Sequence, residues 1–289
     1  YGMLEGKVAD PNDPQRYFMN SGLAYAGLQR AAEWLAEIDP PAGSQLAGQA
    51  ESFRQDIRAA LLECLARSPV IPRRDGAWCP TAPPWAEGVG PTALYCEGEP
   101  TATHHTVTGR DALLGPLWLL FCGVIDPSEP VSDFLMHSHA ELATIYNVPF
   151  SQPYYSRADY AHLRRGEVAA FLKRYYFSLA SLADRETYTF WEHFFHVSPH
   201  KLTEEAWFLM ETRWMLALED GDTLRLLAGI PRAWLSQGHR LAFDHLVTSF
   251  GPVSLQVHSR VAEGLIDARY ACCPGREPAR LLLRLPHPE

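Results

Sequence analysis

Apolar residues recur at helical spacing through most of the chain. In residues 17–38, Leu28, Ala32 and Leu35 lie three or four positions apart, which is the spacing of one helix face. Asp39-Pro40-Pro41 follows, and a proline disfavours helical backbone at the residue before it, so this first helix is expected to end there. The same periodicity predicts further helices over residues 45–66, 113–124, 130–146, 167–183 and 204–218. The helices over residues 17–38 and 45–66 should form a helical hairpin.

The periodicity changes near the C-terminus from about 3.6 residues to two. Val253, Leu255 and Val257 alternate with polar side chains, as in a strand with one buried face. A similar alternation runs through residues 266–270, and residues 281–285 predict another strand. We therefore expect a mainly α fold, with helical hairpins over residues 1–235 and a small antiparallel β region over residues 236–289.

The last predicted helix begins with acidic side chains. Thr203 is expected to cap it, and Glu204 and Glu205 follow in its first turn, where the positive end of the helix dipole favours negative charge. This pattern is typical of a helix start, so we expect a structural role for Glu204. Glu205 could also face a cleft.

Composition narrows the range of partners. The chain has 289 residues and a formal net charge of −9, which argues against nucleic acid, because phosphate binding needs a basic surface. No run of about 18 uninterrupted apolar residues is present, so no membrane partner is expected. The six cysteines form no C-x-x-C pair and leave the compartment open between secreted or periplasmic and cytoplasmic. No motif specifies a metal or another cofactor, so none is expected.

The segment over residues 184–196 is the most informative one for chemistry. It places one carboxylate, Glu192, directly after Phe190 and Trp191. Glycoside hydrolysis needs a carboxyl group that activates water or attacks the sugar, and a second that protonates the leaving oxygen. The C–H faces of sugar rings also pack on flat aromatic rings such as that of Trp191. The structural alternative is that the aromatic side chains belong to the core and that Glu192 forms an ion pair.

Thr189-Phe190-Trp191-Glu192 resembles the T-x-W-E segment found late in the (α/α)6 barrel of α-L-rhamnosidases, which belong to the six-hairpin glycosidase group. The order of predicted elements is similar: helical hairpins, this segment, one more helix and a β-rich tail. Residues 232–257 look like the family's entry into that β-domain. The resemblance implies an (α/α)6 toroid. Since fewer helices are predicted than a complete toroid needs, we expect the later half of such a barrel plus its C-terminal β-domain.

The resemblance also implies roles for the carboxylates. It makes Glu192 the general base of an inverting hydrolysis of an oligo- or polysaccharide, and it places the general acid in an acidic segment earlier in the barrel. No such segment is found, so the acid either precedes the first residue or is another carboxylate of this chain. The candidates are Glu87, Glu97 and Glu205. The structural alternative for Glu87 and Glu97 is a solvated acidic loop.

Loops between the predicted helices supply candidate sugar-binding side chains, because sugar hydroxyls need both donors and acceptors. A toroid gathers alternate loops at one end, so these side chains are expected to line one cleft with Glu192. A partner such as His193, Arg185 or a hydroxyl should keep the Glu192 carboxylate ionised. The candidate binding residues are Trp85, His104, His105, Gln152, Tyr154, Tyr155, Trp191 and His193.

Two other functions stay open. One is a polysaccharide lyase, because α/α toroids also host that chemistry. Its base would be Tyr154, Tyr155 or His105, and Arg157 or Arg110 would neutralise a uronate. The acidic net charge disfavours an anionic polymer as substrate. The other is a non-catalytic carbohydrate-binding or scaffold protein.

Overall fold

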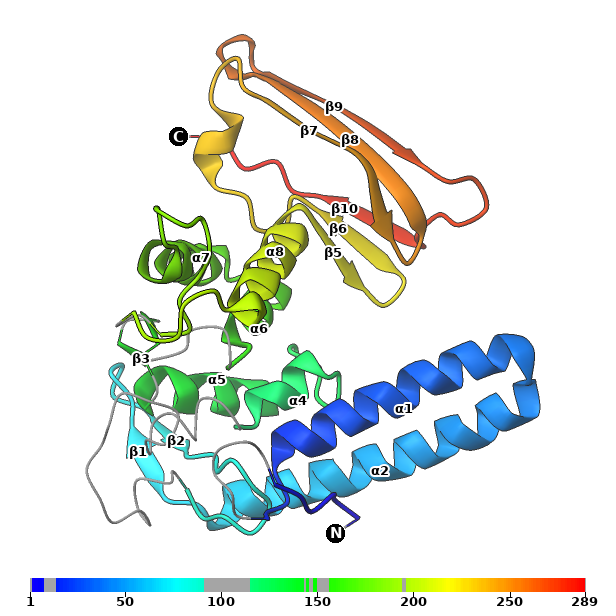
Figure 1. Cartoon of the computed structure of the whole chain (residues 1–289), viewed down its shortest axis with the longest axis vertical. Helices are drawn as coiled ribbons and strands as arrows, with labels where there is room; N and C mark the ends of the chain where they lie inside the picture. Colours follow the sequence, from blue (N-terminus) through cyan, green and yellow to red (C-terminus); the bar gives the residue numbers. More distant parts are fainter. Residues whose placement is uncertain are drawn as a thin grey trace. The chain divides into compact units, whose positions relative to one another are not determined.

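The computed structural model describes residues 2–7, 14–90, 115–142, 144–145, 148–149, 156–193 and 196–288 (Figure 1). These residues form two compact units: Tyr1–Ala161 with Tyr176–Glu204, and His162–Tyr175 with Glu205–Glu289. Helices are followed by small sheets at the C-terminal end, as expected, and the described residues show no closed toroid.

The described helices are α1 (Phe18–Ile38), α2 (Pro40–Arg67), α4 (Leu117–Phe121), α5 (Pro130–Leu142), α6 (Ala158–Arg164), α7 (Val168–Leu182) and α8 (Leu202–Leu216). The strands are β1 (Val70–Pro72), β2 (Trp78–Pro80), β3 (Thr144–Ile145), β4 (Val148–Pro149), β5 (Ala217–Asp220), β6 (Thr223–Leu226), β7 (Arg240–Thr248), β8 (Gly251–Arg260), β9 (Leu265–Cys272) and β10 (Arg280–Leu283). Two short 3₁₀ helices, η2 (Arg232–Leu235) and η3 (Val261–Glu263), complete the list.

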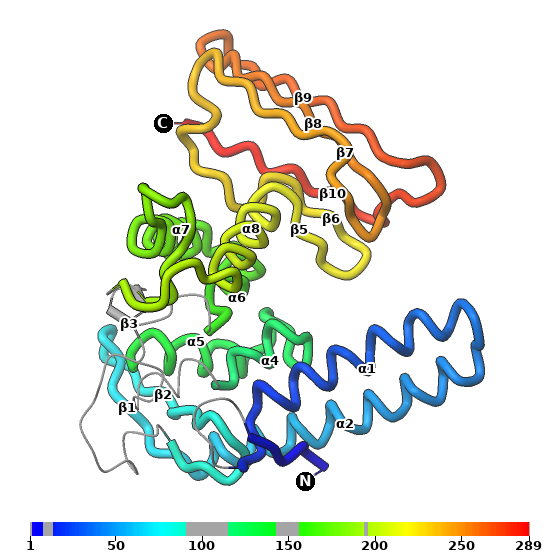
Figure 2. The backbone as a smooth tube through the Cα atoms, in the orientation of Figure 1, coloured from blue at the N-terminus to red at the C-terminus, as the bar shows by residue number. Residues whose placement is uncertain are grey.

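Helices α1 and α2 form the predicted hairpin and lie side by side along their length (Figure 2). Asp39 caps the end of α1 and the start of α2. Its backbone N–H donates to the carbonyl oxygen of Leu35 at 2.7 Å, and its side chain accepts from the backbone N–H of Ala42 at 3.2 Å. Helix α2 begins at Pro40, five residues before the predicted start, since proline fits the first turn of a helix. The two backbones come close at Gly43, where an added Cβ would lie 2.6 Å from the backbone nitrogen of Ala36.

Gly43→Ala should therefore destabilise the first unit by about 1–3 kcal/mol, because rigid backbone rather than a flexible side chain meets the new methyl group. Gly48→Ala is the matched control, since Gly48 lies on the same helix and nothing would come within 4 Å of its Cβ. That change should stabilise the protein by up to about 1 kcal/mol. Urea denaturation of both variants checks the pair. Equal unfolding free energies would contradict the close helix contact.

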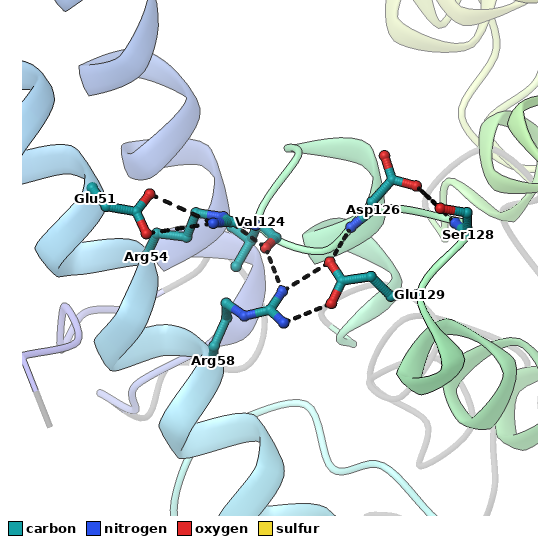
Figure 3. Close-up of polar contacts among 7 residues, drawn as sticks. All are labelled: Glu51, Arg54, Arg58, Val124, Asp126, Ser128 and Glu129. Atoms are coloured by element: carbon teal, nitrogen blue, oxygen red, sulfur yellow. Dashed lines mark hydrogen bonds and ion pairs between the residues drawn. The ribbon is translucent and has the colours of Figure 1, made fainter.

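A network of charges joins α2 to the turn between α4 and α5 (Figure 3). Arg58 binds both carboxylate oxygens of Glu129, at 3.0 and 2.6 Å. Arg54 and Arg58 each donate to the carbonyl oxygen of Val124 at 3.0 Å. Glu129 also accepts the backbone N–H of Asp126 at 2.8 Å. The hydrogen bond from Arg58 holds the pKa of Glu129 below its ordinary value, so this turn is fixed against α2 by a paired, ionised carboxylate.

The second unit carries the C-terminal sheets. Strands β7, β8 and β9 form an antiparallel sheet in which β8 is central, as the alternation of Val253, Leu255 and Val257 predicted. These three side chains are buried, so one face of the sheet is covered. Strands come earlier than the predicted boundary at residue 236: β1–β4 lie among the helices of the first unit, and α8 is followed directly by the β5–β6 hairpin at Ala217. Strand β10 pairs with β6 in parallel, which local periodicity does not reveal.

Two further findings concern the whole set of described residues. None of their helices is both long and apolar enough to cross a lipid bilayer. The five cysteines among them, Cys64, Cys79, Cys122, Cys272 and Cys273, are free.

Candidate functional site

The T-x-W-E segment lies in a tight loop after α7. Asp184 begins this loop, and its side chain accepts the backbone N–H of Glu186 at 2.8 Å. Phe190 then pairs with Ala183, and the backbone N–H of Trp191 donates to the carbonyl oxygen of Leu182 at 2.8 Å. The chain thus returns to the end of α7, which fixes the position from which Glu192 projects.

A second reversal brings a lysine to Glu192. The backbone N–H of Glu192 donates to Ser198 at 3.1 Å, and that of Lys201 donates to Phe190 at 2.9 Å. Thr189 and His200 are hydrogen-bonded through their side chains at 3.0 Å. Residues 189–192 and 198–201 therefore run beside each other. The Nζ atom of Lys201 lies 2.7 Å from Oε2 of Glu192 as a result.

The backbone around this reversal adopts left-handed conformations. Tyr188, His196, Ser198 and His200 have φ angles of 57°, 58°, 56° and 59°. Such angles are uncommon for residues other than glycine, and they persist only where the surrounding structure imposes them. Arg157, which precedes α6, has a φ of 57° as well. Residues with this kind of strain gather at functional sites, which marks the loop as a candidate site.

Glu192 is buried, with 8% of its surface exposed. Burial raises the pKa of its carboxyl group, but the hydrogen bond and charge of Lys201, together with His193 and Ser198, outweigh this effect. The pKa of Glu192 therefore lies below its ordinary value. His193 Nε2 stands 4.0 Å from Oε1 of Glu192. The sequence anticipated His193 as a partner, but it did not anticipate Lys201, which comes nine residues after Glu192.

A second carboxyl group, Glu204, lies in the first turn of α8 in the same unit. Only 1% of its surface is exposed, and neither carboxyl oxygen accepts a hydrogen bond from another of the described residues. Burial raises the pKa of Glu204 to about 7, and the negative charge of Glu192 adds to the rise. The backbone N–H of Glu204 and the charges of Lys201 and Arg157 oppose it. The pKa of Glu192 thus lies below the ordinary value of a glutamate and that of Glu204 lies above it, so near neutral pH Glu192 is ionised and Glu204 is about half protonated.

Arg157 completes this cluster of charges. It is buried, with 3% of its surface exposed, and its guanidinium group lies 4.4 Å from the ring centre of Trp118 and 5.7 Å from that of Phe121. A cation over an aromatic face is attracted by the ring electrons. This stacking orders the guanidinium group, so its positive charge acts on Glu204 from a fixed position.

Trp191 and Trp85 are both half-buried. The ring of Trp191 stacks on that of His196, with centroids 5.3 Å apart and an interplanar angle of 18°. The Trp85 ring meets Tyr17 edge-on at 6.2 Å.

Two of the candidate acids are described. Glu87 is exposed and forms an ion pair with Arg16, as the structural alternative to a catalytic role allows. Glu205 is half-buried and belongs to the other unit.

The remaining candidates fall outside the described residues, so the prediction of one shared cleft stays a prediction. They are Glu97, His104, His105, Arg110, Gln152, Tyr154 and Tyr155. Among the residues that are described, no three His, Cys, Asp or Glu side chains gather as metal ligands would. Comparison of the chain with protein-family models, with curated proteins and with solved structures finds no match.

Sequence reasoning missed the part of Glu204 in this cluster. The position of Glu204 in the first turn of a helix suggested that the helix dipole would favour its ionised form. Burial, which depends on tertiary packing, instead raises its pKa. The available signal was indirect: Lys201, Glu204 and Glu205 follow closely after the T-x-W-E segment.

Proposed function

We propose that this chain forms the later part of a six-hairpin glycoside hydrolase and acts on an oligo- or polysaccharide. In this proposal Glu192 is the general base that takes a proton from the attacking water in an inverting hydrolysis. The helices would be hairpins of an (α/α)6 toroid, and the C-terminal strands would form the accompanying β-domain.

The observation that carries the proposal is the state of Glu192. A general base must be ionised at the working pH, and the ion pair with Lys201 keeps this carboxylate ionised despite its burial. Trp191, beside it in sequence, is half-buried and offers an aromatic surface of the kind that sugar rings pack against. The left-handed backbone at His196, Ser198 and His200 also supports a functional site, because such conformations persist only where the surrounding structure holds them.

A non-catalytic carbohydrate-binding protein is the second candidate. The ion pair between Glu192 and Lys201 favours it, because a buried, paired carboxylate is also a common structural element. In that case neither charge has to take part in chemistry, and removing Glu192 would alter stability rather than rate.

A panel of aryl glycosides and neutral polysaccharides, incubated with the purified chain, separates the candidates. The hydrolase predicts release of reducing ends without an unsaturated product that absorbs in the ultraviolet. Retention on an immobilised polysaccharide without any release of reducing ends would reject the hydrolase and favour the binding protein. An ultraviolet-absorbing product would indicate a lyase instead.

A further inference from the structure

The surroundings of Glu204 are unusual for an acidic residue. It is almost fully buried, and its oxygens accept no hydrogen bond from another described residue. An ionised carboxylate in such a place would lose its hydration without gaining a hydrogen bond from the described residues, so the neutral form is favoured. Glu204 therefore holds a proton at a pH at which exposed glutamates have lost theirs.

The charged groups that act on Glu204 come from three segments of the first unit. Glu192 lies in the loop after α7, Lys201 directly precedes α8, and Arg157 precedes α6. His193 acts on Glu192, which in turn acts on Glu204. The two carboxyl groups therefore sense each other's charge, while the lysine ion-pairs with Glu192. This arrangement keeps one carboxyl ionised and leaves the proton on the other.

We propose that Glu204 is the general acid of the site and donates its proton to the leaving oxygen while Glu192 accepts one from water. This inference rests on the proposed function of Glu192, and it places the acid after the base in the sequence, whereas the resemblance implies an earlier segment. The role requires that substrate binding bring the leaving oxygen within about 2.6–3.2 Å of the Glu204 carboxyl group.

The reaction balances with these two groups and one water. The water oxygen bonds to the anomeric carbon as the bond between that carbon and the leaving oxygen breaks. The leaving oxygen keeps the electron pair and takes the proton of Glu204, and the water proton passes to Glu192. Afterwards Glu192 releases a proton to solvent and Glu204 regains one. This is an acid–base hydrolysis by two carboxyl groups.

The coupling between the two carboxyl groups favours this order of events. Before the reaction, the negative charge of Glu192 helps to raise the pKa of Glu204. When Glu192 accepts the water proton, its charge disappears, so Glu204 becomes a stronger acid at the moment when the leaving oxygen needs a proton. Pairs of carboxyl groups with separated pKa values are how hydrolases divide the two roles.

The test uses Glu204→Gln with two glycosides of the sugar that the wild-type chain hydrolyses. One carries a dinitrophenyl leaving group, which departs without protonation, and the other carries an alkyl leaving group, which requires it. Glu204→Gln should lower kcat/KM for the alkyl glycoside by about 100-fold or more, and that for the dinitrophenyl glycoside only a few-fold. The alkaline limb of the pH profile near pH 7 should also disappear. Glu192→Gln should lower both rates.

Asp159→Asn is the matched control, because Asp159 is a buried carboxyl of the same unit whose oxygens likewise accept no hydrogen bond from the described residues. It should leave the ratio of the two rates unchanged. A Glu204→Gln variant that lowers both rates equally, or that keeps the alkaline limb, would overturn the role of Glu204 while leaving that of Glu192 intact. A wild-type chain that hydrolyses neither glycoside of any sugar tested would overturn the proposed function and this inference together.

Discussion

Glu192→Gln is expected to lower the rate of glycoside hydrolysis by about 100-fold or more, the scale on which general-base catalysis contributes. The amide has nearly the shape of the carboxylate but cannot take a proton from water. Lys201, which now pairs with Glu192 at 2.7 Å, would keep a hydrogen-bond acceptor in the amide oxygen. Binding of the sugar should therefore persist, and the loss should appear in kcat rather than in KM.

Glu186→Gln is the control for this change, because Glu186 is an exposed glutamate of the same loop. Its rate should match that of the wild type. Steady-state kinetics give the rates, and isothermal titration calorimetry of the inactive variant gives the binding. A Glu192→Gln variant with an unchanged rate would leave the carbohydrate-binding protein as the better account.

The second large effect concerns stability and pH. The pKa of Glu204 is about 7 in the folded chain, against an ordinary value of 4.5, which the unfolded chain should show. Below pH 4.5 the group is protonated in both states and costs nothing. As the pH rises from about 4.5 to 7, the unfolded chain loses the proton and the folded chain retains it, so the unfolded state is favoured. The free energy of unfolding should fall by about 3 kcal/mol across this window and then level off.

Comparison with Glu204→Gln isolates this contribution from that of all other groups. Gln does not titrate, so between pH 4.5 and 7.5 the free energy of unfolding of the wild type should fall by about 3 kcal/mol relative to that of the variant. Any difference in stability that does not depend on pH leaves this change unaffected. Urea denaturation at several pH values measures it. Parallel stability curves for the two proteins would show that Glu204 titrates alike in the folded and unfolded states, and would contradict its burial without a hydrogen bond from the described residues.

Local pattern predicted the elements of this chain better than their ends. The hairpin of α1 and α2 and the strand β8 follow from side-chain spacing, because each has one long buried face. Helix α6, with seven residues, is too short for such a face to repeat. The parallel pairing of β10 with β6 joins segments more than fifty residues apart, about which spacing within either segment says nothing.

The candidate site was predictable in part, for a similar reason. The aromatic segment drew attention to Glu192, and the expected ionising partner exists, although Lys201 rather than His193 makes the close contact. Which cation meets Glu192 depends on how residues 193–200 turn, and that turn uses left-handed residues that leave no pattern in the sequence. The burial of Glu204 depends on packing from several segments, which its local sequence does not show. The helix dipole, the one local effect considered, predicts a lowered pKa for Glu204, whereas burial raises it.

The measurement that tests the central claim most directly is a titration of the two carboxyl groups by carbon-13 NMR, with the signals assigned by Glu192→Gln and Glu204→Gln. We expect the Glu204 carboxyl group to give one signal that titrates near pH 7 and is lost in Glu204→Gln. We expect the Glu192 carboxyl group to give a second signal that titrates below pH 4.5 and is lost in Glu192→Gln. In Glu192→Gln the Glu204 signal should titrate at lower pH, because a negative charge has been removed. Two signals that both titrate near 4.5, each indifferent to the other substitution, would contradict the account.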